Sequence, residues 1–281
     1  MATPSRKGTQ PKHRSFLKWA GGKFRLVDEI NKLLPKKQKC LIEPFVGAGS
    51  VFLNSQFERY ILSDINPDLI NLFNIVKNQV DEYINALKPL FFHPQANTAI
   101  YYYAQRERFN QSQDIFERAL LFVYLNRFGF NGLCRYNAKN EFNVPFGAYK
   151  SHYFPEKELR YFAQKAQNAT FICADFTHSF TLAEPDCVIY CDPPYAPLEQ
   201  DSNFTRYAGN DFSLIHQQQL AELAIQTQQQ RRVPVLISNH DTPFTREIYQ
   251  QAKIKRLKVQ RSISQTPAKR AKVAELIAIY R

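Results

Sequence analysis

The chain has 281 residues, a formal charge of +12 at pH 7, and 44% hydrophobic and 14% aromatic residues. This composition is typical of a globular protein with a sizeable core and excludes disorder along the whole chain. No apolar run approaches the roughly 18 residues of a membrane span, and no apolar segment follows the basic N-terminus, so neither a membrane protein nor a secretory signal is expected. At roughly 150 residues per domain, the length suggests one or two domains.

The positive charge favours an anionic partner, nucleic acid first and an acidic membrane surface second. It is concentrated in residues 1–14, which we expect to be a disordered basic tail, and in residues 253–272, which hold eight cations and no acid. A solvated surface explains one such run equally well. Five cysteines without a CxxC pair indicate reduced thiols and a cytoplasmic protein, with Cys187 and Cys191 as small buried hydrophobes. The scattered histidines give no support for a metal site.

Strands and helices alternate in the first part of the chain. Strands are predicted over residues 40–45 and 60–63, and helices from 50 and over 67–78, 81–90, 98–110 and 114–127. Asn66 followed by Pro67 is the pattern of an N-cap and a first helical residue. The helix over 114–127 is apolar on nearly all sides and should be buried.

Residues 129–150 interrupt this alternation, because they are rich in Asn, Gly and aromatics and predict loops and a hairpin. The remaining predicted elements are a helix over 155–168, strands 170–173 and 187–191, a helix over 213–230, strand 233–238, a helix over 244–252 and two closing strands. The glutamine triplet 217–219 is expected on an exposed helix face. The alternation at both ends predicts an α/β parallel sheet, with a helical insertion of about 90 residues between two of its strands.

A turn with two glycines, EPFVGAGS over residues 43–50, follows the first strand. Such a strand-to-helix turn lets the backbone approach a ligand at the carboxyl end of a sheet, although a purely structural turn fits as well. The turn lacks the third glycine of a dinucleotide fingerprint and has no basic side chain, so it suits a nucleoside cofactor without pyrophosphate. Asp64 ends the next strand and is placed to accept hydrogen bonds from a ribose.

The only tryptophan, Trp19, lies in FLKWAGGK over residues 16–23. Two interpretations of this segment stay open. Trp19 packs the N-terminus onto the core, with the glycine pair as a turn, or it forms a stacking wall over a nucleoside, with Lys23 as a charged partner.

The predicted strand over 187–191 runs directly into Asp192-Pro193-Pro194-Tyr195. Proline cannot extend the strand, and two prolines leave rigid carbonyl acceptors beside the carboxylate of Asp192. Rigid acceptors next to an aromatic ring suit a planar group with an amino donor. A nucleobase amine is such a group, and Tyr195 would stack on its face.

In this order FLKWAGGK, EPFVGAGSVF, SDIN and DPPYAP resemble the DNA adenine methyltransferases that use S-adenosylmethionine. About 140 residues separate FVGAG from DPPY, as in the α-ordered amino-methyltransferases, whose target-recognition domain lies there. The resemblance to the bacterial Dam family covers nearly all of residues 15–280 and includes YLNRFGFNGLCRYN, EFNVPFG, NFTRY, PVLISNHDT and VQRSIS. The parts that vary are the tail before Ser15 and two expected linkers near 91–99 and 174–186.

This resemblance implies a Rossmann-like methyltransferase sheet with an inserted, mainly helical target-recognition domain that carries a hairpin. The catalytic domain would comprise residues 15–66 and 156–281, and the target-recognition domain 67–155. The implied cofactor is S-adenosylmethionine, with S-adenosylhomocysteine as product and no metal. The implied partner is double-stranded DNA, bound by a monomer in the bacterial cytoplasm that associates with the nucleoid through DNA.

The implied reaction is methyl transfer to the exocyclic amine of an adenine flipped out of the duplex. The cofactor-binding positions would be Trp19, Lys23, Phe45, Gly47, Gly49, Asp64 and Asp192. The catalytic positions would be Asp192, Pro193, Pro194 and Tyr195. Asp192 and the Pro193 carbonyl would accept the two amine hydrogens and localise the lone pair. Residues 203–207 would form a loop over the flipped base.

Residues 130–149 mix Asn and Arg with aromatics, and in the major groove Asn reads adenine and Arg reads guanine. By the resemblance, the DNA-binding residues are Lys18, Phe130, Asn131, Leu133, Arg135, Asn137, Lys139 and Pro145, and the target is GATC. Two alternatives stay open. One is an amino-methyltransferase with another target, such as a restriction-modification enzyme or one acting on cytosine or RNA. The other is a catalytically inactive DNA-binding relative.

Overall fold

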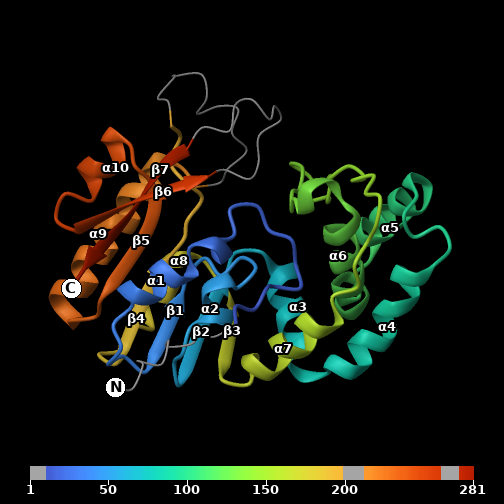
Figure 1. Ribbon diagram of the computed structural model, residues 1–281, viewed down its shortest axis with the longest axis horizontal. Coiled ribbons are helices and arrows are strands. Elements are labelled where there is room, and N and C mark those ends of the chain that lie inside the picture. Colours follow the sequence, from blue (N-terminus) through green and yellow to red (C-terminus); the bar gives the residue numbers. More distant parts are fainter. Residues whose placement is uncertain (1–10, 199–211, 261–271) are drawn as a thin grey trace, which may run out of the picture.

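A seven-stranded sheet forms the centre of the computed structural model, which describes residues 11–198, 212–260 and 272–281 (Figure 1). The strand order is β3-β2-β1-β4-β5-β7-β6, and only β7 runs against its neighbours. The strands are β1 Cys40–Glu43, β2 Arg59–Asp64, β3 Ala169–Cys173, β4 Cys187–Cys191, β5 Val235–His240, β6 Lys253–Gln260 and β7 Lys272–Tyr280. The predicted α/β class and Rossmann-like sheet are confirmed.

The helices are α1 Val27–Leu33, α2 Ser50–Asn54, α3 Pro67–Asn78, α4 Val80–Phe92, α5 Ala99–Gln111, α6 Ile115–Phe128, α7 Glu156–Ala166, α8 Phe176–Thr181, α9 Leu214–Arg231 and α10 Pro243–Ile248, with short 3-10 turns η1 Lys23–Arg25 and η2 Phe130–Gly132. The predicted cap of α3 is confirmed, since the Asn66 side chain accepts from the amides of Asp68 and Leu69. None of the helices in these ranges is long and apolar enough to cross a membrane.

Two helices depart from the sequence prediction. The pattern did not predict α1, and the segment around 174–186 was expected to be a linker. It holds α8, which is capped by the Asp175 side chain at the amide of Thr177. An Asx N-cap was therefore the available signal for α8, but six helical residues are too few for a clear apolar period.

The chain reverses its direction of travel through the sheet at β1. It leaves β1 for β2 and β3 on one side and returns to β4 on the other side, where Cys40 pairs in register with Cys187. Ligands of such sheets bind beyond the carboxyl ends of the strands at this reversal point. The FVGAG turn follows β1 and DPPY follows β4, so both motifs meet at this edge. Cys187 and Cys191 are fully buried, as predicted.

The helices α4, α5 and α6 lie to one side of the sheet, in teal and green in Figure 1. Residues 121–126 and Phe128 of α6 are buried, as its apolar sequence predicts. The core is continuous between this side and the sheet, because Phe73 of α3 packs on Phe162 of α7 and on Phe171 of β3. The bounds of the two domains stay a prediction.

The segment between α6 and α7 folds back on itself through two isolated antiparallel bridges, Gly129 with Phe146 and Tyr136 with Phe142. The predicted hairpin is therefore present in a reduced form, without a continuous ladder. Its tip is closed by side-chain hydrogen bonds of Asn137 to the amides of Lys139 and Glu141.

Candidate active site and DNA-reading segment

Lys23 and Asp192 meet at the carboxyl edge of the sheet, where the Lys23 Nζ lies 2.8 Å from Asp192 Oδ1. The Lys23 ammonium also donates to the Gly21 carbonyl at 2.9 Å and lies 4.6 Å from the ring centroid of Tyr195. The Tyr195 hydroxyl donates to the Glu275 carboxylate of β7 at 3.1 Å. The structure thus brings together three predicted site residues, and it adds Glu275, for which the sequence analysis predicted no role.

A second carboxyl, Glu43, lies buried at the end of β1 with 3% of its surface exposed. Its Oε1 has no hydrogen-bond partner in the part of the chain that the structure describes. Burial raises the pKa of Glu43 well above its usual range, and the neighbouring Asp192 carboxylate raises it further. Burial also raises the pKa of Asp192, while the Lys23 ammonium acts in the opposite direction. Two neighbouring carboxyls therefore lie at this edge, and of the two only Asp192 is paired with the Lys23 ammonium.

The FVGAG turn lies directly against Trp19. Gly47 has a φ of +47°, and a Cβ on this residue would lie 2.8 Å from Trp19 Nε1. Any side chain at this position would both strain the backbone and displace the indole ring. Because Trp19 also packs against the core, it joins the N-terminal segment to the turn, as the first interpretation of Trp19 expected. Stacking on a nucleoside stays a prediction.

Asp64 connects two turns at the end of β2. Its Oδ2 accepts from the Gly47 amide at 3.1 Å, and its Oδ1 accepts from the Asn66 amide at 3.1 Å. Burial raises the pKa of Asp64, and these amides oppose the shift. The carboxylate is thus held at the strand end beside the turn. Phe45 of the same turn stacks on Phe176, with ring centroids 5.6 Å apart.

The DPPY segment is held by groups from α9 and β5. The Gln217 side chain donates to the Pro194 carbonyl at 2.7 Å, and the Asn239 side chain accepts from the Ala196 amide at 3.0 Å. His240 Nδ1 lies 2.7 Å from the Ala196 carbonyl. The prediction of an exposed glutamine triplet is wrong for Gln217, which is 1% exposed. A polar repeat carries no signal for a tertiary partner, so the contact of Gln217 with Pro194 could not be predicted from the sequence.

This edge of the sheet fits a cationic nucleoside cofactor. The turn leaves no room for a side chain at Gly47, and residues 44–50 contain no basic group for a pyrophosphate. The Asp192 carboxylate favours a positive charge near the end of β4, and the unpartnered Glu43 oxygen leaves a hydrogen-bond acceptor at the end of β1. A carboxylate at Asp64 suits a ribose diol.

The predicted DNA-reading residues lie mainly on the surface of the 129–150 segment. Phe130 is 44% exposed, and Asn131 beside it has a φ of +53°, in the left-handed region. Arg135 is exposed, and its Nε donates to Asn143 Oδ1 at 2.7 Å, which fixes the direction of the guanidinium. Lys139 and Pro145 are exposed as well, and Leu133 is half-buried. The Asn137 side chain accepts hydrogen bonds from the amides of Lys139 and Glu141 at the hairpin tip, which leaves less of it available for DNA.

One arm of the hairpin is anchored, close to the tip, to an ion pair between α3 and α6. The Asp68 carboxylate accepts from Arg118 Nε at 2.8 Å and from its Nη2 at 2.9 Å. The Tyr136 hydroxyl donates to the same carboxylate at 2.7 Å. These contacts fix one arm of the hairpin against the helices.

Lys18 lies at the junction between the N-terminal segment and α6. Its Nζ donates to the Arg127 carbonyl at 2.8 Å and lies 3.6 Å from the ring centroid of Tyr149. Burial lowers the pKa of Lys18 to about 8, and the Arg127 charge adds to the effect. Lys18 is therefore close to the 129–150 segment, although it belongs to the segment that leads to the active site.

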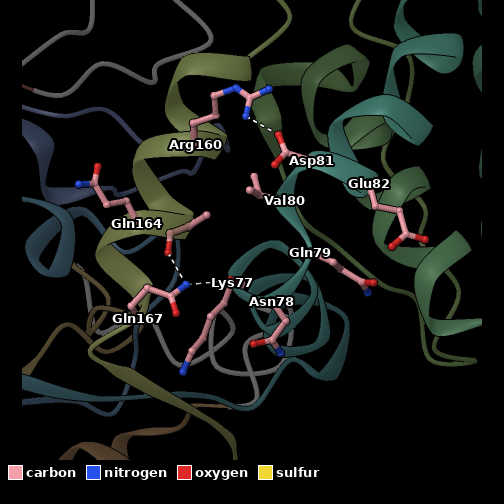
Figure 2. Close-up of a pocket in the computed structure, with 10 residues that line it drawn as sticks. Lys77, Asn78, Gln79, Val80, Asp81, Glu82, Arg160, Gln164 and Gln167 are labelled. Carbon is pink, nitrogen blue, oxygen red and sulfur yellow. Dashed lines mark hydrogen bonds and ion pairs between the residues drawn. The ribbon is translucent and has the colours of Figure 1, made fainter.

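A hollow of about 430 Å³ lies between the α3–α4 junction and α7 (Figure 2). Arg160 pairs with Asp81 there at 2.6 Å, and the Gln167 side chain donates to the Lys77 carbonyl. The Lys77 ammonium donates to the carbonyl of Ala169, at the amino end of β3. The hollow is thus at the edge of the sheet opposite Asp64 and Asp192, and we give it no part in the chemistry.

Three predicted regions lie wholly or partly outside the described residues. These are the loop over 203–207, residues 1–10 of the basic tail and residues 261–271 of the second basic run. Of that run, residues 253–260 form β6, where Arg256 pairs with Asp241 at 3.3 Å, and Lys272 begins β7.

FVGAG and DPPY at the reversal point of this sheet are the arrangement expected of an amino-methyltransferase. The chain matches the family of D12 class N6 adenine-specific DNA methyltransferases over residues 19–263 and belongs to that family. It is 68% identical over 282 residues to the DNA adenine methylase of Haemophilus influenzae, covering 100% of this chain and 99% of that protein.

Other relatives agree with this assignment. The DNA adenine methylase of Escherichia coli K12 is 59% identical over 270 residues, and that of Vibrio cholerae is 56% identical over 269, each match covering 96% of both chains. The predicted resemblance is confirmed, and the protein is an adenine-specific DNA methyltransferase.

Proposed function

We propose that the protein transfers a methyl group from S-adenosylmethionine to the exocyclic amine of an adenine in duplex GATC. The observation that carries this proposal is the Asp192 carboxylate, paired with Lys23 at 2.8 Å and followed by two prolines at the carboxyl end of β4. When bound, the cofactor supplies a methyl group activated by its sulfonium.

The carboxyl edge of the sheet holds this cofactor. Asp64 accepts from the ribose hydroxyls, and Trp19 with Phe45, Gly47 and Gly49 of the turn encloses the rest of the nucleoside and amino-acid parts. The sulfonium and the amino group are cations, and the Glu43 and Asp192 carboxyls favour both. Burial raises the pKa of both carboxyls, and a cation bound beside them would favour their ionised forms.

Asp192 and the carbonyl of Pro193 activate the adenine amine. The lone pair of this amine is delocalised into the ring, so the amine is a poor nucleophile. Two acceptors that bind its hydrogens localise the lone pair on nitrogen, and they act best when they are oriented before the reaction. Prolines fix the backbone here, and Gln217 and Asn239 hold the following carbonyl and amide in place. Tyr195 supports the base from its face.

Target selection belongs to the 129–150 segment and to Lys18. The adenine leaves the stack at a cost of a few kcal/mol. Phe130 and Asn131 are exposed, and we expect them near the position that the base vacates. Arg135, already directed by Asn143, reads a guanine with its guanidinium. Leu133, Pro145 and Lys18 complete the base contacts, while Asn137 and Lys139 at the hairpin tip contact the backbone of the DNA.

Transfer of labelled methyl groups from S-adenosylmethionine into two duplexes of equal composition, one with GATC and one without, tests this function. We expect incorporation into the GATC duplex alone. Equal incorporation into both would support a methyltransferase with another target, and no incorporation into either would overturn the proposal.

A substitution at each end of β4 tests the role of Asp192. Asp192→Ala should abolish transfer and leave duplex binding nearly unchanged. Asp186→Ala is the matched control, because Asp186 precedes the same strand at the opposite edge of the sheet and pairs with Arg59 at 2.6 Å. It should keep transfer, and equal loss of transfer in both variants would contradict the role of Asp192.

A further inference from the structure

The buried side chain of Asn126 ties the N-terminal segment to the DNA-reading segment. Its Oδ1 accepts from the Lys18 amide at 2.8 Å, and its Nδ2 donates to the Lys18 carbonyl at 2.7 Å. The same Nδ2 donates to the Gly132 carbonyl at 3.2 Å. Asn126 is 1% exposed, so all three hydrogen bonds are shielded from water. One amide therefore connects residues 108 positions apart in sequence.

Lys18 and Gly132 also touch directly. A Cβ on Gly132 would lie 2.1 Å from Lys18 Cβ, and Gly132 has a φ of +61°. Only glycine permits this approach without moving one of the two backbones. Gly132 ends η2, which begins with Phe130 and Asn131, two of the residues expected near the flipped base. If η2 moves when DNA binds, the movement would reach Lys18 by two routes. One is the direct contact with Gly132, and the other is the hydrogen bonds of Asn126.

A segment of six residues, 18–23, leads from this contact to the active site. Its second residue, Trp19, lies against Gly47 of the turn, and its last residue, Lys23, pairs with Asp192. The segment is therefore held at the DNA-reading end by Asn126 and at the catalytic end by Asp192. Between these two ends the Gly22 amide donates to the Trp19 carbonyl at 3.3 Å, so a hydrogen-bonded turn links them.

We propose that Asn126 is a positioning residue that couples occupation of the DNA-reading segment to the cofactor and catalytic side chains, through the backbone of Lys18. The coupling acts on the methyl transfer proposed above and rests on that function. By linkage, a cognate duplex then changes the affinity for cofactor, and cofactor changes the affinity for the duplex by the same factor. Such factors are typically about 5- to 150-fold.

A second asparagine provides a matched control. The Asn54 side chain accepts from the His13 amide at 2.8 Å and donates to the His13 carbonyl at 2.9 Å and to the Ser50 carbonyl at 2.8 Å. Asn54 thus holds the same N-terminal segment with the same pattern of bonds, but none of these side-chain bonds reaches the 129–150 segment. If Asn126 served only to hold the N-terminal segment in place, substitution of Asn54 should have the same effect as substitution of Asn126.

The test measures the affinity of the full chain for S-adenosylhomocysteine by calorimetry, with and without a GATC duplex. The emission of Trp19, the only tryptophan, is recorded during titration with the duplex alone. We expect the wild type to show a coupling factor of at least about fivefold and an emission change on binding DNA. Asn126→Ala should bring the factor close to one and suppress the emission change, whereas Asn54→Ala should retain both.

Gly132→Ala disturbs the contact between Gly132 and Lys18 and leaves the Asn126 side chain in place. It should also reduce the coupling factor. Thermal unfolding of each variant shows whether it is folded at the temperature of the assay. The proposal is overturned if the wild type shows no coupling, if folded Asn126→Ala or Gly132→Ala keeps the wild-type factor, or if Asn54→Ala loses it equally. A wild type that methylates GATC but shows one of these results refutes the coupling alone, whereas absence of transfer by the wild type refutes the proposed function.

Discussion

The ammonium of Lys23 lies 2.8 Å from the carboxylate of Asp192, and the two side chains are 7% and 21% exposed. The pair joins the N-terminal segment to the end of β4, two parts of the chain that are far apart in sequence. Because both groups are shielded from water, removal of one partner leaves the other charge poorly solvated. The ion pair therefore controls the charge of Asp192 as well as its position.

Replacement of Lys23 should shift the acid limb of the pH–rate profile. Asp192 must be ionised to accept the amine hydrogens, so the rate falls as the pH falls through its pKa. Burial already raises that pKa and Lys23 opposes the shift. In Lys23→Gln the pKa rises further, and the acid limb moves to higher pH. Single-turnover rates of methyl transfer across the acid range measure this shift.

Lys165→Gln is the control for that experiment. The Lys165 ammonium donates to the Ser55 carbonyl at 2.8 Å and lies 4.8 Å from the ring of Tyr60, so it is also a lysine packed over a tyrosine. It lies away from Asp192 and should leave the acid limb where it is. An unchanged limb in Lys23→Gln would refute the electrostatic role of Lys23.

The affinity for duplex DNA should fall as the pH rises through about 8, because burial lowers the pKa of Lys18 to about 8. Above this pH Lys18 is largely neutral, and a hydrogen bond from a charged group, worth about 1.5–3 kcal/mol, is lost. Lys18→Ala should bind more weakly at neutral pH and show little further loss. Binding titrations of both proteins at constant ionic strength check this, and parallel pH profiles would contradict it.

Arg135→Ala should cost about 1–3 kcal/mol of discrimination at one guanine position of the target. The hydrogen bond from Arg135 to Asn143 holds the guanidinium in one direction, as direct reading of a base edge requires. Lys139→Ala, at the exposed hairpin tip, should weaken binding to all duplexes alike and reduce the salt dependence by about one phosphate contact. Competition binding with single-substituted sites measures both. A uniform loss in Arg135→Ala would make it a phosphate contact instead.

The anchor of the hairpin should matter strongly for stability. Asp68→Ala leaves Arg118 buried without its carboxylate, and the free energy of unfolding should fall by about 3–5 kcal/mol. Tyr136→Phe removes one hydrogen bond to Asp68 and should cost about 1 kcal/mol. The exposed pair of Arg160 and Asp81 is the comparison, since Asp81→Ala should cost only about 0–1 kcal/mol. Denaturant unfolding separates these cases, and equal losses would show that burial is not decisive.

The sequence predicted the order of the main elements because their apolar periods and caps are local signals. Asn66 with Pro67 located the start of α3, and the break at the two prolines located the end of β4. Gln217 and Asn126 could not be interpreted in this way. Their partners, Pro194 and Lys18, come from other parts of the chain. The local sequence around an asparagine or glutamine does not show whether its side-chain amide faces water or a buried carbonyl.

Glu43 could be predicted in part. It stood inside a motif that was recognised, yet only the fold shows that it is buried next to Asp192 with an unpartnered oxygen. Its burial depends on strands β2 and β4 on either side of β1, which no local pattern specifies.

The placement of the insertion between β2 and β3 has a consequence for biosynthesis. Tyr60 pairs with Ala169, so more than a hundred residues must be made before β2 gains its outer neighbour. At roughly 5–20 residues per second, the ribosome takes about 5–20 s over this stretch, during which β2 has an open edge. Long-range parallel pairing of this kind is slow and exposes the nascent chain to aggregation. A chaperone that shields this edge during translation would therefore raise the yield of native enzyme more than one supplied afterwards.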